Sequence, residues 1–203
     1  MKRSILNLVV TALVLCMASA MLSAKVGDSA PDFTGTASNG KTVHLADYRG
    51  KYVVLEWHNN GCPYVGKHYK SGNMQRLQKQ WTGQGVVWLT ILSSAPGNQG
   101  YVTASQENDY LAKMQAAPTA ALLDPTGQIG HLYDAKTSPQ MIVINPQGVV
   151  IYDGAIDDKP TTDLNDVPGA TNYVSRALEE VMAGKPVETA ATRPYGCSVK
   201  YGD

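Results

Sequence analysis

The sequence is poor in cysteine, and the spacing of its cysteines excludes two common kinds of site. Its 203 residues contain only Cys16, Cys62 and Cys197, and no two of these lie within a few residues of one another. A Cys-x-x-Cys dithiol and a zinc site with short ligand spacing are therefore not expected. Any reaction between two cysteines must join distant parts of the chain.

Charge of either sign is also sparse and dispersed. Lysine and arginine together number 17, as do aspartate and glutamate, so the formal net charge is zero. The absence of a basic stripe or of a block of like charges argues against nucleic acid or an anionic membrane as a partner. Glycine-rich phosphate loops and the serine nucleophile motif are missing as well, and no bound cofactor is expected.

Only one long apolar run occurs, and it lies at the start of the chain. Two basic residues precede the run 5–15, and two small-residue cleavage sites follow, ending at Ala20 and at Ala24. This is the layout of a secretory signal peptide, and the run is too short to span a bilayer. We predict a signal peptide over residues 1–24, a periplasmic or secreted protein, and no membrane contact after cleavage.

The remaining chain predicts one α/β domain over residues 25–185. Two buried strands, 52–57 and 86–92, flank a helix that begins at Cys62, and a parallel strand–helix–strand unit follows from this order. The other expected elements are a hairpin within 26–43, a helix over 103–116, a short strand 120–123, a hairpin of 141–144 with 149–152, a surface loop 157–169 and a helix over 173–182. They predict a mixed central sheet with helices on both faces and an N-terminal hairpin. Residues 186–203, which carry Cys197, are predicted to form an irregular tail.

Cys62 is the strongest candidate for a reactive group. It follows a buried strand directly at the N-cap of the predicted helix, with Pro63 in the first turn. Unpaired backbone N–H groups and the positive end of the helix dipole favour a thiolate at such a position. The alternative is an inert cysteine that fills a corner of the core.

Several motifs resemble those of a known superfamily. The segment 53–65, which ends in Asn-Asn-Gly-Cys-Pro-Tyr-Val, resembles the active-site segment of the thioredoxin-like redoxins, which include alkyl hydroperoxide reductases and thiol-specific antioxidants. The likeness covers about residues 27–183. It is closest to small exported redoxins with Lys-His-Tyr, Ser-Gly-Asn-Met-Gln and a terminal Pro-Tyr-Gly-Cys-Ser-Val-Lys-Tyr. The resemblance implies a thioredoxin-like fold and thiol–disulfide chemistry.

The resemblance also implies roles for individual residues. Cys62 matches the attacking cysteine, and Pro139 matches a cis-proline that faces it. Ser138 would then offer its backbone to an incoming peptide or thiol, and Glu56 matches a buried acid that assists proton transfer. A carboxyl inside an apolar strand is expected to have a raised pKa. Two further residues, Trp57 and Tyr64, flank the thiol and are candidates for an apolar platform that contacts a partner, with plain packing as the alternative.

Two departures from the superfamily pattern keep alternatives open. Val65 stands where thioredoxins have their second cysteine, whereas Asn59 and Pro139 stand where peroxiredoxins have their activating threonine and arginine. Cys197 is the candidate for the missing resolving cysteine. A static Cys62–Cys197 bridge, worth about 4 to 5 kcal/mol in the chain-entropy model, would instead make the chain a binding module.

Four interpretations of function therefore remain. The first is a thiol–disulfide oxidoreductase that acts on a partner thiol protein or on a small thiol. The second is a thiol peroxidase that reduces a peroxide, and the third is the non-catalytic binding module. The fourth is copper delivery by His58, Cys62 and His68, although their spacing matches no usual metal motif.

Overall fold

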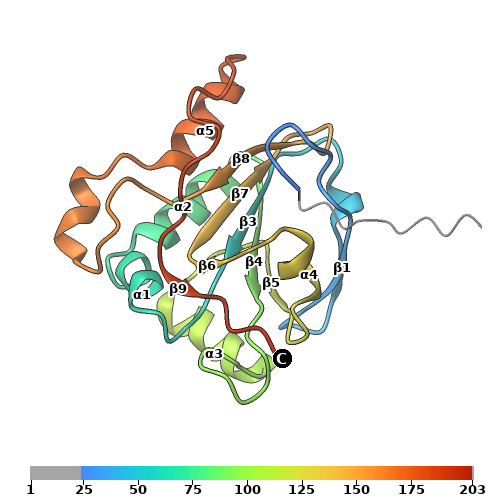
Figure 1. Cartoon of the computed structure of the whole chain (residues 1–203), viewed down its shortest axis with the longest axis vertical. Helices are drawn as coiled ribbons and strands as arrows, with labels where there is room; N and C mark the ends of the chain where they lie inside the picture. Colours follow the sequence, from blue (N-terminus) through green and yellow to red (C-terminus); the bar gives the residue numbers. More distant parts are fainter. Residues whose placement is uncertain (1–23, 203) are drawn as a thin grey trace, which may run out of the picture.

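A seven-stranded mixed sheet lies at the centre of the structure, which is a computed structural model that describes residues 24–202 (Figure 1). The strand order is β2-β1-β5-β4-β3-β7-β8, in which β3, β4 and β5 are parallel and the other neighbours are antiparallel. The strands are β1 Thr34–Ala37, β2 Thr42–His44, β3 Val53–Trp57, β4 Val87–Leu92, β5 Ala120–Leu123, β7 Gln140–Ile144 and β8 Val150–Gly154. A separate ribbon pairs β6 Thr137–Ser138 with β9 Cys197–Ser198.

Helices cover both faces of this sheet. They are α1 Pro63–Lys70, α2 Asn73–Thr82, α3 Ala104–Met114, α4 Gln128–Leu132 and α5 Tyr173–Met182, with short 3-10 helices at Leu45–Tyr48 and Leu164–Gly169. In Figure 1, α1, α2 and α5 lie on one side of the sheet and α4 lies on the other. This arrangement is the thioredoxin-like α/β fold that the sequence predicted.

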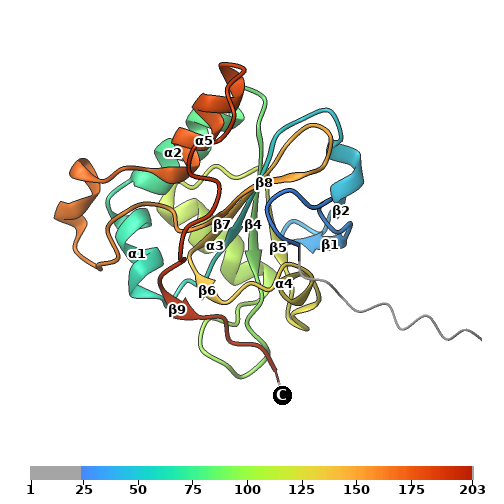
Figure 2. The same ribbon diagram turned by 45° about the horizontal axis from the view of Figure 1, so that its top comes forward.

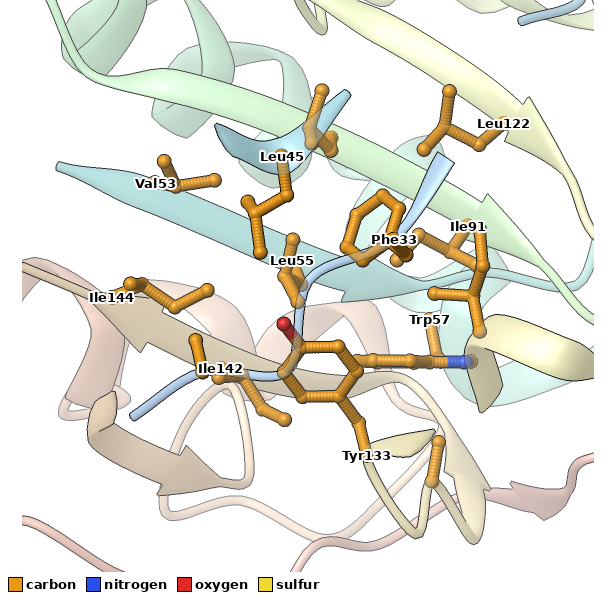
Figure 3. Close-up of a cluster of buried hydrophobic side chains, with 14 of the residues drawn as sticks. Phe33, Leu45, Val53, Leu55, Trp57, Ile91, Leu122, Tyr133, Ile142 and Ile144 are labelled. Carbon is orange, nitrogen blue, oxygen red and sulfur yellow. The ribbon is translucent and has the colours of Figure 1, made fainter. Parts of the chain in front are cut away.

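Strand β3 has apolar side chains on both faces because both faces are buried. Leu55 and Trp57 point into the cluster that also holds Phe33 and Tyr133 (Figure 3). Val54 points to the opposite face, among residues of α1, α2 and α5. A strand buried on both sides has a nearly continuous apolar run, and this is why the sequence pattern identified β3.

Two elements differ from the sequence prediction. The helix after Cys62, in which we expected a kink at Ser71-Gly72, is fully divided there into α1 and α2, because Gly72 adopts a left-handed conformation (φ 74°) and starts a new helix. The second difference is α4, which was not predicted. It has only five residues, and the Asp124 carboxylate binds the backbone N–H groups of Ile129 and Gly130 at its start.

The C-terminal segment is more ordered than the predicted irregular tail. It runs past α1 and pairs through β9 with β6, as Figures 1 and 2 both show. The predicted signal peptide, apart from Ala24, lies outside the described residues. Within residues 24–202, no helix has both the length and the apolar character that are required to cross a membrane.

Candidate active site

Cys62 lies at the end of the loop that connects β3 to α1. The loop 58–61 ends the strand, the Asn59 side chain accepts a hydrogen bond from the Gly61 N–H (2.9 Å), and Cys62 occupies the N-cap with φ −81° and ψ 124°. Pro63 starts the helix, where its missing N–H costs no hydrogen bond. The Cys62 side chain is 1% exposed. The N-cap position predicted from the sequence is therefore confirmed.

The second cysteine lies directly against the first. The Sγ atoms of Cys62 and Cys197 are 2.8 Å apart and unbonded, and the Cys62 thiol also lies 3.1 Å from the Ser138 carbonyl oxygen. Cys197 is only partly buried. Burial and the adjacent Cys62 sulfur raise the pKa of Cys197 to about 11. Two residues that are 135 positions apart in the chain thus form one thiol pair.

Pairing of β6 with β9 brings the two cysteines together. Ser138 is opposite Cys197 in the antiparallel register, and the Ser138–Pro139 peptide bond is cis, as the resemblance predicted. Gly196 (φ 143°) passes so close that a Cβ atom there would lie 2.1 Å from the Ser138 carbonyl oxygen. The backbone edge that was predicted to receive a partner is occupied by the chain's own tail.

The tail is held on both sides of Cys197. Downstream, the Val199 N–H donates to the Lys136 carbonyl (2.9 Å), and the Tyr201 ring stacks on His131 at a centroid distance of 4.1 Å. Upstream, the Thr192 hydroxyl bonds to Tyr152 (2.7 Å) and accepts from the Ala155 N–H (2.9 Å). These contacts fix where Cys197 lies relative to Cys62.

Glu56 is fully buried beneath the site. Its carboxylate accepts hydrogen bonds from Trp88 (2.7 Å), Tyr69 (2.8 Å), Gln78 (3.2 Å) and Thr90 (3.2 Å). Burial alone would raise the pKa of Glu56, but the hydrogen bond and charge of His58, together with Trp88 and Tyr69, lower it overall. The raised pKa that we expected from the sequence is therefore wrong, since the sequence did not show these donors.

A chain of polar side chains connects Glu56 to the loop before Cys62. His58 Nδ1 lies 3.4 Å from Glu56, His58 Nε2 lies 2.5 Å from Asn60 Oδ1, and the Asn60 amide donates to Glu107 (3.0 Å). Both ring nitrogens of His58 face oxygen acceptors, which favours the doubly protonated ring. Glu107, on α3, is buried, and its second carboxylate oxygen has no hydrogen-bond partner among the described residues.

The buried His58 predicts a pH-dependent stability. Burial alone would lower the pKa of His58, but Glu56, the charge of Glu107 and the hydrogen bond to Asn60 raise it above 6.5 overall; the rings of Tyr69 and Tyr110 also face it. Because the folded state binds this proton more tightly than the unfolded state, protonated His58 stabilises the fold fully below pH 6.5. This stabilisation is lost as the pH rises through the folded-state pKa of His58. We expect urea unfolding of the reduced protein to show this loss.

The variant His58→Gln should not show this loss. Its control is His44→Gln, which alters an exposed histidine and should keep the wild-type pH profile. Equal slopes above pH 6.5 for His58→Gln and the wild type would contradict the assignment of the charge to His58. Glu56 has the opposite dependence: because its pKa is lowered in the fold, the ionised carboxylate stabilises the fold above pH 4.5, and this stabilisation is lost as the pH falls below that value.

A second buried polar group joins the tail to α1. Lys67 and His68 point away from Cys62 toward Asp157, at 3.8 Å and 3.9 Å, and the Tyr195 hydroxyl donates to Asp157. Burial and the charge of Lys67 lower the pKa of His68 to about 4, although Asp157 opposes this. Asp157 is 2% exposed. Our expectation that residues 157–169 form a surface loop is therefore wrong for Asp157, because distant residues bury it.

The structure separates the two aromatic residues that we predicted to form a platform. Trp57 is fully buried and packs on Tyr133 at a centroid distance of 5.9 Å, so the platform interpretation is wrong for this residue and the packing interpretation holds. Tyr64 is partly buried, and its ring packs edge-on against Tyr195 of the tail at 5.8 Å. Tyr64 therefore contacts the chain's own tail.

The candidate metal ligands are not gathered into one group. His58 is bound to Glu56 and Asn60, whereas His68 bonds to Asn73 (2.9 Å) and lies 3.4 Å from the Tyr195 hydroxyl. Across the part of the chain that the structure describes, no three His, Cys, Asp or Glu residues are placed so that they could hold a metal ion.

A cleft lies beside Cys62, between α1 and α3. Its volume is about 500 Å³, and it is lined by Asn60, Gly61, Cys62, Pro63, Gly66, Lys70, Tyr110, Lys113 and Met114. A larger hollow of about 630 Å³ lies along the tail, beside Tyr64, Tyr195 and Gly196, and Cys62 is not part of its lining. Only the first of these two spaces is lined by Cys62. The sequence did not predict this cleft, because no local pattern placed the helix 103–116 beside Cys62.

The fold and the paired thiols define a thioredoxin-like protein. The chain belongs to the AhpC/TSA family, which matches residues 26–153 and so more than half of its length. It is 28% identical over 125 residues to the thiol-disulfide oxidoreductase ResA of Bacillus subtilis (strain 168), covering 62% of this chain and 64% of ResA.

Other known proteins share parts of the chain or its fold. A thiol peroxidase of Oceanobacillus iheyensis is 37% identical over 73 residues, which are 36% of this chain and 42% of that protein. The chain thus spans less than two thirds of either curated relative. An uncharacterized conserved protein from Geobacillus kaustophilus superposes with a TM-score of 0.77 at 23% identity, over 88% of this chain and 93% of that one. This last likeness concerns the fold alone.

Proposed function

We propose that the chain is an exported thiol–disulfide oxidoreductase in which Cys62 is the nucleophile and Cys197 is the resolving cysteine. The observation that carries the proposal is the 2.8 Å contact between the two sulfur atoms, which the β6–β9 pairing creates. The similarity to a thiol-disulfide oxidoreductase over 125 residues supports it. Export rests on the signal peptide predicted from residues 1–24.

The reaction proceeds by two thiol–disulfide exchanges. The Cys62 thiolate attacks one sulfur of a substrate disulfide, which releases one substrate thiolate and forms a mixed disulfide on Cys62. Cys197 then loses its proton and attacks Cys62 Sγ, which releases the second substrate thiolate and forms the Cys62–Cys197 bridge. The substrate gains two electrons and the protein loses two. Two thiols of a partner reverse the sequence: the first attacks the bridge, the second releases the partner as its own disulfide, and both protein thiols are restored.

The pKa of Cys197 fits this order. It is raised to about 11 by burial and by the adjacent Cys62 sulfur, so Cys197 stays protonated while Cys62 makes the first attack. Once Cys62 is in a mixed disulfide it no longer carries a negative charge, and one cause of the raised pKa disappears. Cys197 then becomes a better nucleophile at the moment when its attack is required.

Glu56 is a positioning residue in this proposal. It accepts hydrogen bonds from Tyr69, Gln78, Trp88 and Thr90, and His58 and Asn60 connect it to the loop before Cys62. It holds the loop 58–61 that presents Cys62. Ser138 and Pro139 hold the tail in place, and a protein substrate would have to displace the tail in order to use that edge.

The variant Cys197→Ser provides the test. We expect Cys62 of this variant to accumulate a stable mixed disulfide with the substrate thiol, because residues 24–202 then contain no second thiol to release it. The wild type, treated in the same way with a small disulfide, should form the intramolecular bridge and release both substrate thiols. Mass spectrometry of the intact protein and of its Cys62 peptide distinguishes the two products.

Two controls separate the proposal from its alternatives. Cys62→Ser should form neither product at that peptide. A static staple predicts that the bridge resists reduction, so a bridge with a reduction potential below about −300 mV would contradict a working redox pair. A thiol peroxidase is the second candidate, on account of its relative in Oceanobacillus iheyensis. It predicts that the reduced wild type consumes hydrogen peroxide faster than it exchanges with disulfides.

A further inference from the structure

The space beside Cys62 that Cys197 does not occupy is the cleft between α1 and α3. Cys197 and the Ser138 carbonyl contact the Cys62 sulfur from the tail side. No residue of the tail lines the cleft, although Cys62 does. Cys62 therefore lines the cleft, and its resolving partner does not.

Exchange at sulfur imposes a direction on the groups involved. The attacking sulfur, the central sulfur and the leaving sulfur lie roughly in line during the step. When Cys197 attacks a mixed disulfide on Cys62, the leaving group must therefore lie away from Cys197. With the tail docked on β6, the cleft is the space beside Cys62 that no tail residue lines, and its volume of about 500 Å³ has room for a small organic group.

The lining of the cleft indicates what kind of group it accepts. Pro63, Tyr110 and Met114 supply apolar and aromatic surface, and no acidic residue lines the cleft. Two lysines, Lys70 and Lys113, also line it. Lys70 folds back over α1, since its Nζ lies 3.9 Å from the point where a Cβ on Gly66 would be. Neither Lys70 nor Lys113 forms an ion pair within residues 24–202, so both ammonium groups are free to bind an anion.

We infer that this cleft binds the leaving half of a low-molecular-weight disulfide that combines an apolar or aromatic body with a carboxylate, and that Lys70 and Lys113 bind the carboxylate. The inference rests on the proposed function and names its substrate class. The chemistry is balanced: Cys62 displaces one carboxylate-bearing thiolate, the second stays in the cleft as a mixed disulfide, and Cys197 releases it with formation of the bridge.

Two aromatic disulfides of similar size test the inference. Dithiobis(nitrobenzoate) carries a carboxylate on each ring, and dithiodipyridine is uncharged. The first exchange step is followed in the Cys197→Ser background as release of the coloured thiol, and mass spectrometry identifies the adduct on Cys62. We expect Lys70→Gln combined with Lys113→Gln to lower the ratio of the two rates, anionic over neutral, by about tenfold, since two charge contacts are lost.

Two exposed lysines outside the cleft provide the control. The double variant Lys41→Gln with Lys79→Gln removes the same charge from exposed lysines outside the cleft, and it should keep the wild-type ratio. Raising the salt concentration should lower the wild-type preference toward that of the cleft variant. An unchanged ratio in the cleft variant, or an equal fall in both rates, overturns the inference but not the proposed function. If neither disulfide reacts with Cys62, the proposed function fails as well.

Discussion

Replacing Glu56 by alanine should lower the free energy of unfolding by about 3–5 kcal/mol, because it breaks a buried ion pair and leaves one partner uncompensated. His58 would then have to stay charged with only Glu107 as a nearby counter-ion, or lose its proton inside the core, and both cost free energy. Trp88, Tyr69, Gln78 and Thr90 would each lose an acceptor in a region without solvent. A donor left unpaired in the interior costs about 1–3 kcal/mol, although such losses are not additive.

Urea unfolding of the reduced proteins measures this loss. Glu179→Ala is the matched control, because Glu179 is an exposed helical glutamate and its removal should change stability by no more than about 0.5 kcal/mol. Glu56→Gln keeps the shape and one acceptor oxygen, so it should fall between the wild type and Glu56→Ala. A loss below about 1 kcal/mol for Glu56→Ala would mean that the buried charge of His58 is not held by Glu56.

The substitution Gly196→Ala should separate the two cysteines without removing either thiol. The added Cβ would lie 2.1 Å from the Ser138 carbonyl oxygen and 2.6 Å from its carbon, both of which are backbone atoms that cannot rotate away. The backbone of Gly196 (φ 143°) is also unfavourable for alanine, at a cost of about 1–3 kcal/mol. The tail must therefore shift, and Cys197 moves away from Cys62.

We expect bridge formation in Gly196→Ala to be slowed by about tenfold or more, which corresponds to at least 1.4 kcal/mol lost from the docked arrangement. The first attack of Cys62 on a small disulfide should keep its rate, because the cleft contains no tail residue. Quenched reactions analysed by mass spectrometry would show the mixed disulfide persisting before the bridge forms. Gly202→Ala is the control, since a Cβ there makes an ordinary contact of 3.4 Å with Ala95.

Unchanged resolution in Gly196→Ala would show that the β6–β9 pairing does not position Cys197. A fall in the first rate and the second rate together would indicate general damage to the site. The expected result is that the single methyl group of Gly196→Ala slows the attack of Cys197 and not the attack of Cys62, while both thiols remain present.

The sequence by itself determined the elements whose pattern is local. The buried strand β3, the N-cap position of Cys62 and the β7–β8 hairpin follow from short runs of residues, because periodicity and helix-terminus chemistry depend only on near neighbours. The resemblance of residues 53–65 and 137–139 to redoxins added the thioredoxin-like fold and the cis-proline, and the structure confirms both.

The tertiary structure decided everything that depends on distant groups. The lowered pKa of Glu56 depends on how His58 is oriented and on donors from Trp88 of β4 and Tyr69 of α1, and the burial of Asp157 comes from Lys67, His68 and Tyr195. No local pattern reports which far side chain will supply a hydrogen bond or exclude water. The sequence predicted Cys197 as the partner of Cys62, but only the pairing of β9 with β6 brings their sulfurs into contact, because 135 positions of chain must first fold around a common sheet.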